Sequence, residues 1–179
     1  PTMGGVFVCA AVLIAMALFG NFKSRTLPIF GFTIAALGLI GAIDDYLKLS
    51  GLKKTGMSMK AKLIGQIMVG YIVGVWLYLV MLKIDPVHAS RIYIPFDGYI
   101  DIGVFYPAFV MLVVVASSNA VNITDGLDGL AGGCVAISVF AFAVIAYVVS
   151  RPDFSEYLGL PCVRSGAETG VICAAVLGI

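Results

Sequence analysis

The chain has 179 residues, of which 61% are hydrophobic and only 12% are charged. A soluble domain is typically about half apolar and about a quarter charged, so this composition indicates a membrane protein. The formal net charge is only +1, which excludes nucleic-acid binding driven by bulk electrostatic attraction.

Five apolar stretches approach the length of a membrane-spanning helix, which needs about 20 apolar residues. They cover residues 4–19, 27–43, 63–82, 102–117 and 127–149, and a sixth stretch at residues 170–179 is too short to span. Each stretch is expected to be a helix, because backbone polar groups inside a membrane must be satisfied within the segment. We predict an all-α fold, a polytopic transmembrane helix bundle with five spans plus a truncated sixth, in one membrane domain of residues 1–179. The chain starts without Met and stops inside an apolar run, so we expect an internal fragment of a longer protein.

The order of the spans assigns the connecting segments alternately to the two faces of the membrane. Residues 1–3, 44–62 and 116–126 fall on one face, and the five lysines within residues 44–62 favour that face as cytoplasmic. The opposite face carries residues 91–100, where two short extended pieces flank an Asp-Gly pair and predict a short hairpin on the non-cytoplasmic side. His88 lies on this opposite face, where we expect a solvated side chain rather than a ligand or a base.

Two adjacent carboxylates, Asp44 and Asp45, close the second apolar stretch, and Lys48 follows them. At the end of a helix they face the negative end of its dipole, and they also repel each other. A bound divalent cation or a cationic partner would relieve that repulsion. The alternative is structural, with Lys48 pairing with both acids along the helix for about 0.2–0.5 kcal/mol per pair. The motif alone leaves both interpretations open.

The densest polar region lies between the fourth and fifth apolar stretches, at residues 118–131. It carries oxygen-bearing side chains at every third position, at Asn119, Asn122, Asp125 and Asp128. Nearby glycines favour a broken backbone, so we expect a helix to end near Asn119 and a new one to start at Asp125 or Gly126. Helix capping by Asp125, with Asp128 in the first turn, is the structural alternative. The functional reading is a hard-oxygen site for Mg²⁺ or for a sugar nucleotide, since polar groups this close to hydrocarbon are expensive.

Four lysines follow the Asp44-Asp45 pair within a short segment, at Lys53, Lys54, Lys60 and Lys62. They suit anchoring to anionic lipid headgroups, or a phosphate clamp in which Lys acts as a point charge. With the two acidic motifs on the same face, they favour a polyanionic ligand with a metal. Phosphoryl transfer fits that combination, because its catalysis rests on positioning and charge neutralisation.

These motifs resemble those of the polyprenyl-phosphate N-acetylhexosamine-1-phosphate transferase superfamily, and within it the muramoyl-pentapeptide branch. The resemblance covers essentially the whole chain in order. Four stretches carry it: Pro1-Thr2-Met3-Gly4-Gly5, Ile43-Asp44-Asp45-Tyr46-Leu47-Lys48, Ser118 to Ala131, and Leu158-Gly159-Leu160-Pro161 with Gly166-Ala167-Glu168.

The resemblance implies a ten-helix enzyme of the bacterial inner membrane, usually a homodimer, with an active site facing the cytoplasm. Such an enzyme moves phospho-MurNAc-pentapeptide from UDP-MurNAc-pentapeptide to undecaprenyl phosphate. The products are lipid I, a precursor of peptidoglycan, and UMP, and the reaction requires Mg²⁺. The implied partners are therefore the two substrates, the membrane lipids and a second copy of the protein, with no nucleic acid.

Residue by residue, the resemblance makes Asp44, Asp45 and Asp125 the catalytic candidates, with Asp44 and Asp45 also as candidate Mg²⁺ ligands. It places Lys48 and Lys60 on the diphosphate and nucleotide side of the cleft. The remaining substrate-binding candidates are Thr2, Asn119, Asn122, Gly126, Leu127 and Asp128. A further family aspartate of the Mg²⁺ site and a His-rich motif are expected beyond Ile179, so we expect the fragment alone to be inactive.

Two alternatives remain open from the sequence. A relative that uses UDP-N-acetylglucosamine shares the same chemistry and differs in its substrate. A cation-coupled transporter also keeps acids at broken helices, but it places them near the middle of the bilayer. Here both acidic motifs lie at the ends of spans, which counts against transport.

Overall fold

The computed structural model of the chain describes residues 4–50, 56–94, 98–126, 129–160, 162–163 and 165–178. The chain divides into two compact units, one formed by Pro1–Gly38 with Ala120–Ile179 and the other by Leu39–Asn119. Helix α2 (Leu27–Leu49) and helix α4 (Tyr106–Thr124) each contribute residues to both units. The prediction of a single membrane domain stays a prediction.

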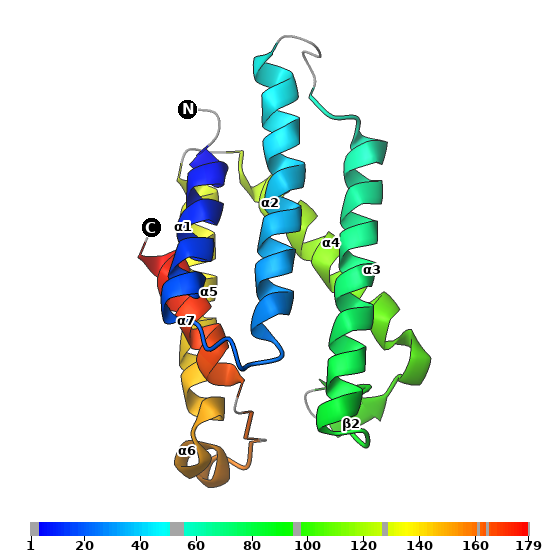
Figure 1. Cartoon of the computed structure of the whole chain (residues 1–179), viewed down its shortest axis with the longest axis vertical. Coiled ribbons are helices and arrows are strands. Elements are labelled where there is room, and N and C mark those ends of the chain that lie inside the picture. The colour runs from blue at the N-terminus through cyan, green and yellow to red at the C-terminus, as the bar shows by residue number, and fades with distance from the viewer. Residues whose placement is uncertain are drawn as a thin grey trace. The chain divides into compact units, whose positions relative to one another are not determined.

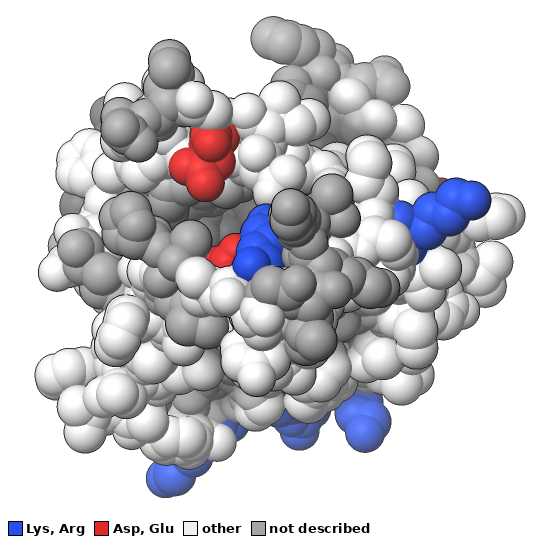
Figure 2. All heavy atoms as spheres, turned by 90° about the horizontal axis from the view of Figure 1, so that it is seen from above, with Lys and Arg blue, Asp and Glu red and all other residues white. Residues whose placement is uncertain are grey.

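Within the described residues, four helical segments are long and apolar enough to cross a membrane. They are α2, α3 (Met59–Ile84), the segment Gly103–Thr124 that contains α4, and α5 (Leu130–Ser150). The first predicted span is a helix as expected, α1 (Gly4–Phe19), but its 16 residues extend only about 24 Å, less than the roughly 30 Å of a hydrocarbon core. Among the described residues on the face drawn in Figure 2, Lys, Arg, Asp and Glu side chains occupy only small patches. The all-α membrane fold is confirmed.

The prediction that the fourth apolar helix ends near Asn119 is wrong. Helix α4 continues to Thr124, and the next helix, α5, begins at Leu130 with Gly129 as its N-cap at φ 81°. Asp125 is therefore not the N-cap of α5. It directly follows the end of α4, where its backbone N–H donates to the carbonyl of Val121 at 3.1 Å. Side-chain bonds to the preceding turn accompany the continued helix, from Asn119 Nδ2 to the carbonyl of Val115 at 2.9 Å and from Thr124 Oγ1 to that of Ala120 at 2.9 Å.

In the first unit, helix α7 (Gly166–Leu177) lies beside α1 and α5 (Figure 1). Val12, Met16 and Leu27 form a small buried apolar core there. Glu168, buried in the first turn of α7, accepts a hydrogen bond from the backbone N–H of Asn21 at 3.1 Å. This bond ties the segment after α1 to α7, so the acidic residue of the last family stretch has a structural partner.

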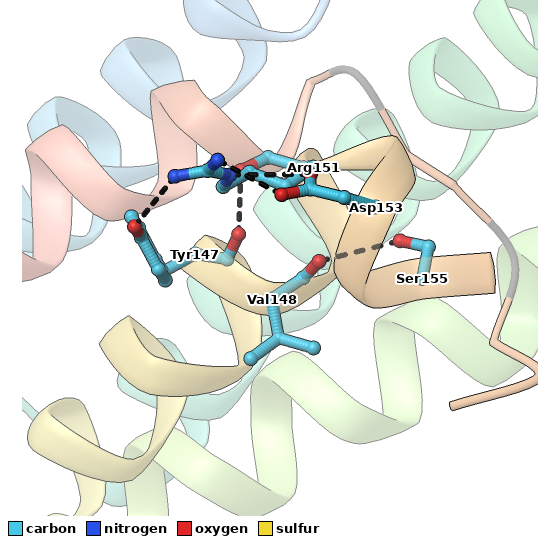
Figure 3. A network of polar contacts seen from close by, with 6 residues as sticks. Tyr147, Val148, Arg151, Asp153 and Ser155 are labelled. Atoms are coloured by element: carbon cyan, nitrogen blue, oxygen red, sulfur yellow. Dashed lines mark hydrogen bonds and ion pairs between the residues drawn. The ribbon is translucent and has the colours of Figure 1, made fainter. Parts of the chain in front are cut away.

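Arg151 holds the corner between α5 and the short helix α6 (Pro152–Tyr157), as Figure 3 shows. Its guanidinium donates to the Tyr147 hydroxyl at 2.9 Å and to the Asp153 carboxylate at 2.9 Å. The hydrogen bond from Arg151 holds the pKa of the Asp153 carboxyl below its ordinary value. Buried Ser155 donates to the carbonyl of Val148 at 3.2 Å, which closes the same corner from the other side. These contacts fix how α6 leaves α5.

In the second unit, α3 packs closely against α4 along two glycines (Figure 1). A Cβ at Gly74 would lie 2.6 Å from the carbonyl oxygen of Pro107, and one at Gly70 would lie 3.0 Å from the Cα of Met111. Glycines four residues apart let the backbones of membrane helices approach in this way.

The predicted hairpin is confirmed as an antiparallel pair of β1 (Arg91–Ile94) and β2 (Gly98–Asp101). The carboxylate of Asp101 closes it, accepting from Ser90 Oγ at 2.6 Å and from the backbone N–H of Gly103 at 2.9 Å. These bonds lower the pKa of Asp101, the Ser90 bond most of all. The assignment of the hairpin to the non-cytoplasmic side stays a prediction.

Candidate functional site

Asp44 is a buried carboxylate with both oxygens engaged. It lies near the end of α2 and is only 8% exposed. One oxygen is 2.7 Å from Lys48 Nζ, and the other accepts a hydrogen bond from the backbone N–H of Met57 at 2.7 Å. The pairing of Asp44 with Lys48 expected from their spacing is therefore present. Asp44 also accepts the hydrogen bond from Met57, which the sequence does not reveal.

Gly56 makes that second contact possible. Its φ of +70° lies in the left-handed region that side chains rarely adopt. A Cβ at this position would also stand 2.5 Å from Asp44 Oδ1 and 2.7 Å from Lys48 Cε. A glycine is needed both for the turn and for the close approach of the backbone to the carboxylate. Asp44 thus anchors the chain that leads into α3.

Asp45 is more accessible than its neighbour. Its side chain is 37% exposed, and its nearest carboxylate oxygen lies 3.8 Å from Lys48 Nζ, the outer limit of an ion pair. Lys48 itself is 44% exposed, so its ammonium bridges the two acids while remaining open to solvent or to an anion. The structure brings these three predicted residues together in the last turns of one helix.

The described residues do not form a Mg²⁺ site by themselves. No three side chains of His, Cys, Asp or Glu gather closely enough in the described part of the chain to hold a metal ion. Both oxygens of Asp44 are already occupied, which leaves Asp45 as the accessible carboxylate of the pair. Mg²⁺ prefers six oxygen ligands, several of them water, and one carboxylate supplies only part of that set.

Lys60 lies exposed in the first turn of α3, two residues after the N-cap Ser58. The hydroxyl of Ser58 accepts a hydrogen bond from the backbone N–H of Ala61 at 3.3 Å, which explains why α3 begins here. Lys53 and Lys54 lie outside the described residues, so the phosphate-clamp hypothesis for that stretch stays a prediction.

Asn119 is held by an amide network within the second unit. Its Nδ2 donates to Gln66 Oε1 on α3 at 2.8 Å, and Gln66 Nε2 donates to Ser118 Oγ at 2.9 Å. Gln66 is only 1% exposed. Sequence reasoning missed Gln66, although an amide inside the apolar stretch of residues 63–82 was a signal that could have found it.

The remaining predicted residues of the polar region at residues 118–131, together with Thr2, are exposed or lie outside the described residues. Asn122 lies exposed on α4, and Asp125 and Gly126 are exposed just after the helix. Thr2, Leu127 and Asp128 lie outside the described residues. Asn122 and Asp125 belong to the first compact unit and Asp44 to the second, so the expectation that both motifs line one cleft stays a prediction.

His88 lies in the segment between α3 and β1, and its side chain is 55% exposed. Its Nδ1 is 2.8 Å from Asp85 Oδ2. This hydrogen bond lowers the pKa of Asp85. The expectation of a solvated His88 is confirmed, with one acidic neighbour added.

The long apolar helices define a membrane protein, and Asp44, Asp45 and Lys48 gather charged groups near the end of one of them. The chain belongs to glycosyl transferase family 4, whose model matches residues 27–177. The predicted family resemblance is thereby confirmed.

Three relatives of known name each match 99% of this chain. The chain is 39% identical over 180 residues to the phospho-N-acetylmuramoyl-pentapeptide-transferase of Thermodesulfovibrio yellowstonii, covering 99% of this chain and 49% of the relative. It is 37% identical over 182 residues to the protein of that name from Chlorobium phaeobacteroides, covering 99% and 48%. For the Borreliella afzelii protein of that name, the identity is 36% over 181 residues, covering 99% and 50%. The chain therefore spans about half the length of the curated relatives it matches.

Proposed function

We propose that this chain is part of a membrane enzyme that transfers phospho-MurNAc-pentapeptide from UDP-MurNAc-pentapeptide to undecaprenyl phosphate. The observation that carries the proposal is the 39% identity, along 99% of the chain, to a phospho-N-acetylmuramoyl-pentapeptide-transferase. An oxygen of the lipid phosphate bonds to the phosphorus attached to the sugar, and the bond from that phosphorus to UMP breaks. The products are lipid I and UMP.

The described contacts support distinct roles for the charged residues. Lys48 and Lys60 are exposed cations that meet the diphosphate, with Lys48 able to exchange its contact with Asp44 for one with phosphate oxygen. Asp45 and Asp125 have accessible carboxylates for accepting a proton from the lipid phosphate. Asp44 acts by holding Lys48 and the chain at Met57 in place.

The polar region at residues 118–131 is proposed to bind the sugar-nucleotide end of the substrate. We assign Asn119, Asn122, Gly126, Leu127 and Asp128 to it, together with Thr2. Amide and carboxylate side chains suit the hydroxyl and N–H groups of a uridine and an N-acetyl sugar. The proposal includes a homodimer in the bacterial inner membrane with these motifs facing the cytoplasm.

A Mg²⁺ requirement is part of the proposal. Divalent ions neutralise the developing charge in phosphoryl transfer from a nucleotide diphosphate. The described residues offer only part of a ligand set, so the site needs residues or phosphate oxygens beyond them. Removal of divalent ions with EDTA should abolish turnover, and Mg²⁺ should restore it.

The test uses the full-length protein that contains this chain, purified in detergent, with UMP release as the readout. Release should require UDP-MurNAc-pentapeptide and undecaprenyl phosphate together. Asp125→Asn should lower the rate at least about 100-fold if it moves a proton. A preference for UDP-N-acetylglucosamine, or an unchanged rate in Asp125→Asn, would contradict the proposal.

A further inference from the structure

Gln66 is a buried amide that the proposed chemistry does not use. It is 1% exposed and stands in α3, a helix long and apolar enough to span a membrane. A buried amide in apolar surroundings is costly unless its hydrogen bonds are made. Here they are made on both sides, with Nε2 donating to Ser118 Oγ at 2.9 Å and Oε1 accepting from Asn119 Nδ2 at 2.8 Å.

The packing of α3 on α4 does not require this amide. Gly70 and Gly74, four and eight residues after Gln66, lie on the same face of α3 and already allow close contact with α4. Tyr78, four residues after Gly74, continues the same face, and its ring centre is 6.0 Å from that of Tyr106. A small or apolar residue at position 66 would continue this face without burying a polar group.

The carbonyl of Val115 fixes the direction of the network. Asn119 Nδ2 also donates to that carbonyl at 2.9 Å. A carbonyl oxygen only accepts, so the Asn119 atom beside it must be the nitrogen, and the Gln66 atom beside the same nitrogen must be the oxygen. Within the described part of the chain, Asn119 Oδ1 is then the side-chain atom of this residue with no hydrogen-bond donor.

We propose that Gln66 is a positioning residue that presents Asn119 Oδ1 as a hydrogen-bond acceptor to an N–H or O–H group of the sugar nucleotide. The proposal rests on the proposed function, because the family resemblance is what assigns Asn119 to the substrate. Gln66 does not touch the substrate. It uses both donor positions of the Asn119 amide nitrogen, together with Val115, and so prevents the amide from turning over.

The test measures kcat and KM of the full-length enzyme in detergent for UDP-MurNAc-pentapeptide. Gln66→Leu keeps a similar volume and removes both hydrogen bonds, so KM should rise about tenfold, the effect of one well-placed bond, while kcat changes less than about threefold. Ser118→Ala loosens Gln66 from the other side and should raise KM about threefold. Ser117→Ala, at the exposed neighbouring serine, is the matched control and should leave both constants unchanged.

A double substitution separates positioning from general destabilisation. In an Asn119→Ala background, Gln66→Leu should raise KM no further, because the group that it positions is gone. The positioning role is overturned if Gln66→Leu and Ser118→Ala match Ser117→Ala, or if the Gln66→Leu effect persists in full without Asn119. Should Gln66→Leu fail to fold, Ser118→Ala alone and with Asn119→Ala decides the question. Absence of UMP release by the unsubstituted enzyme would instead reject the proposed function.

Discussion

The carboxylate of Asp44 accepts a hydrogen bond from the backbone N–H of Met57 across 2.7 Å, so a side chain near the end of α2 anchors the residues that lead into α3. Its other oxygen is 2.7 Å from Lys48 Nζ. Within the described residues the adjacent Asp45 has no such anchor, and its side chain is 37% exposed. Two neighbouring acids of one motif therefore occupy different environments, and different consequences are expected for their substitution.

Asp44→Asn should destabilise the protein, whereas Asp45→Asn should not. An Asn amide at position 44 cannot accept from both the Met57 N–H and Lys48, because its nitrogen is a donor. Losing one of these partly buried bonds should lower the free energy of unfolding by about 1–2 kcal/mol. The exposed pair of Asp45 with Lys48 should contribute less than about 0.5 kcal/mol. Unfolding of both variants by denaturant in detergent measures the difference, and equal losses would contradict the anchoring role of Asp44.

Gly56→Ala should be more damaging than Gly98→Ala. Both glycines have positive φ, 70° and 90°, so both substitutions carry a backbone strain of about 1–2 kcal/mol. Only the Cβ at position 56 meets other atoms, Asp44 Oδ1 at 2.5 Å among them, while nothing lies within 4 Å of a Cβ at position 98. We expect an additional loss of about 1–3 kcal/mol for Gly56→Ala from overpacking. Thermal unfolding of the two variants side by side measures this, and indistinguishable midpoints would argue against the close contact.

Gly74→Ala should weaken the packing of α3 on α4, with Gly41→Ala as its control. The added methyl at position 74 would be 2.6 Å from the Pro107 carbonyl oxygen, whereas a Cβ at position 41 on α2 meets nothing within 4 Å. Overpacking predicts a loss of about 1–3 kcal/mol for Gly74→Ala. Gly41→Ala should be neutral or slightly stabilising because alanine favours the helix. Unfolding in mixed micelles reports both, and a neutral Gly74→Ala would show that the helices do not meet there.

The sequence predicts the helices better than the contacts between them. Apolar length located the spans, and the spacing of Asp44 and Lys48 indicated their pairing. The sequence mislocates the end of α4, because the glycines that follow favour a backbone break as early as Asn119, whereas Asn119 bonds back to Val115 within the helix. The bond from Asp44 to Met57 was not predictable, because it joins residues 13 apart through a turn that depends on Gly56.

The Asp153 carboxyl should titrate below the ordinary value of about 3.9. The hydrogen bond from Arg151 lowers its pKa in the folded protein. A lowered folded pKa means that the contribution to stability is present above the unfolded pKa and is lost as pH falls through the folded pKa. A carbon-13 NMR titration of Asp153 measures the midpoint, and Arg151→Gln should move it back upward. A wild-type midpoint at or above the ordinary value would contradict the ion pair drawn in Figure 3.

We propose that this chain belongs to an enzyme making a lipid-linked muramoyl-pentapeptide. The most direct measurement is mass spectrometry of the lipid product formed by the full-length protein from UDP-MurNAc-pentapeptide, undecaprenyl phosphate and Mg²⁺. The expected product is undecaprenyl diphosphate carrying the MurNAc-pentapeptide, formed in equal amount to the UMP released. Unchanged undecaprenyl phosphate under these conditions, or a product only when UDP-N-acetylglucosamine is supplied, would contradict it.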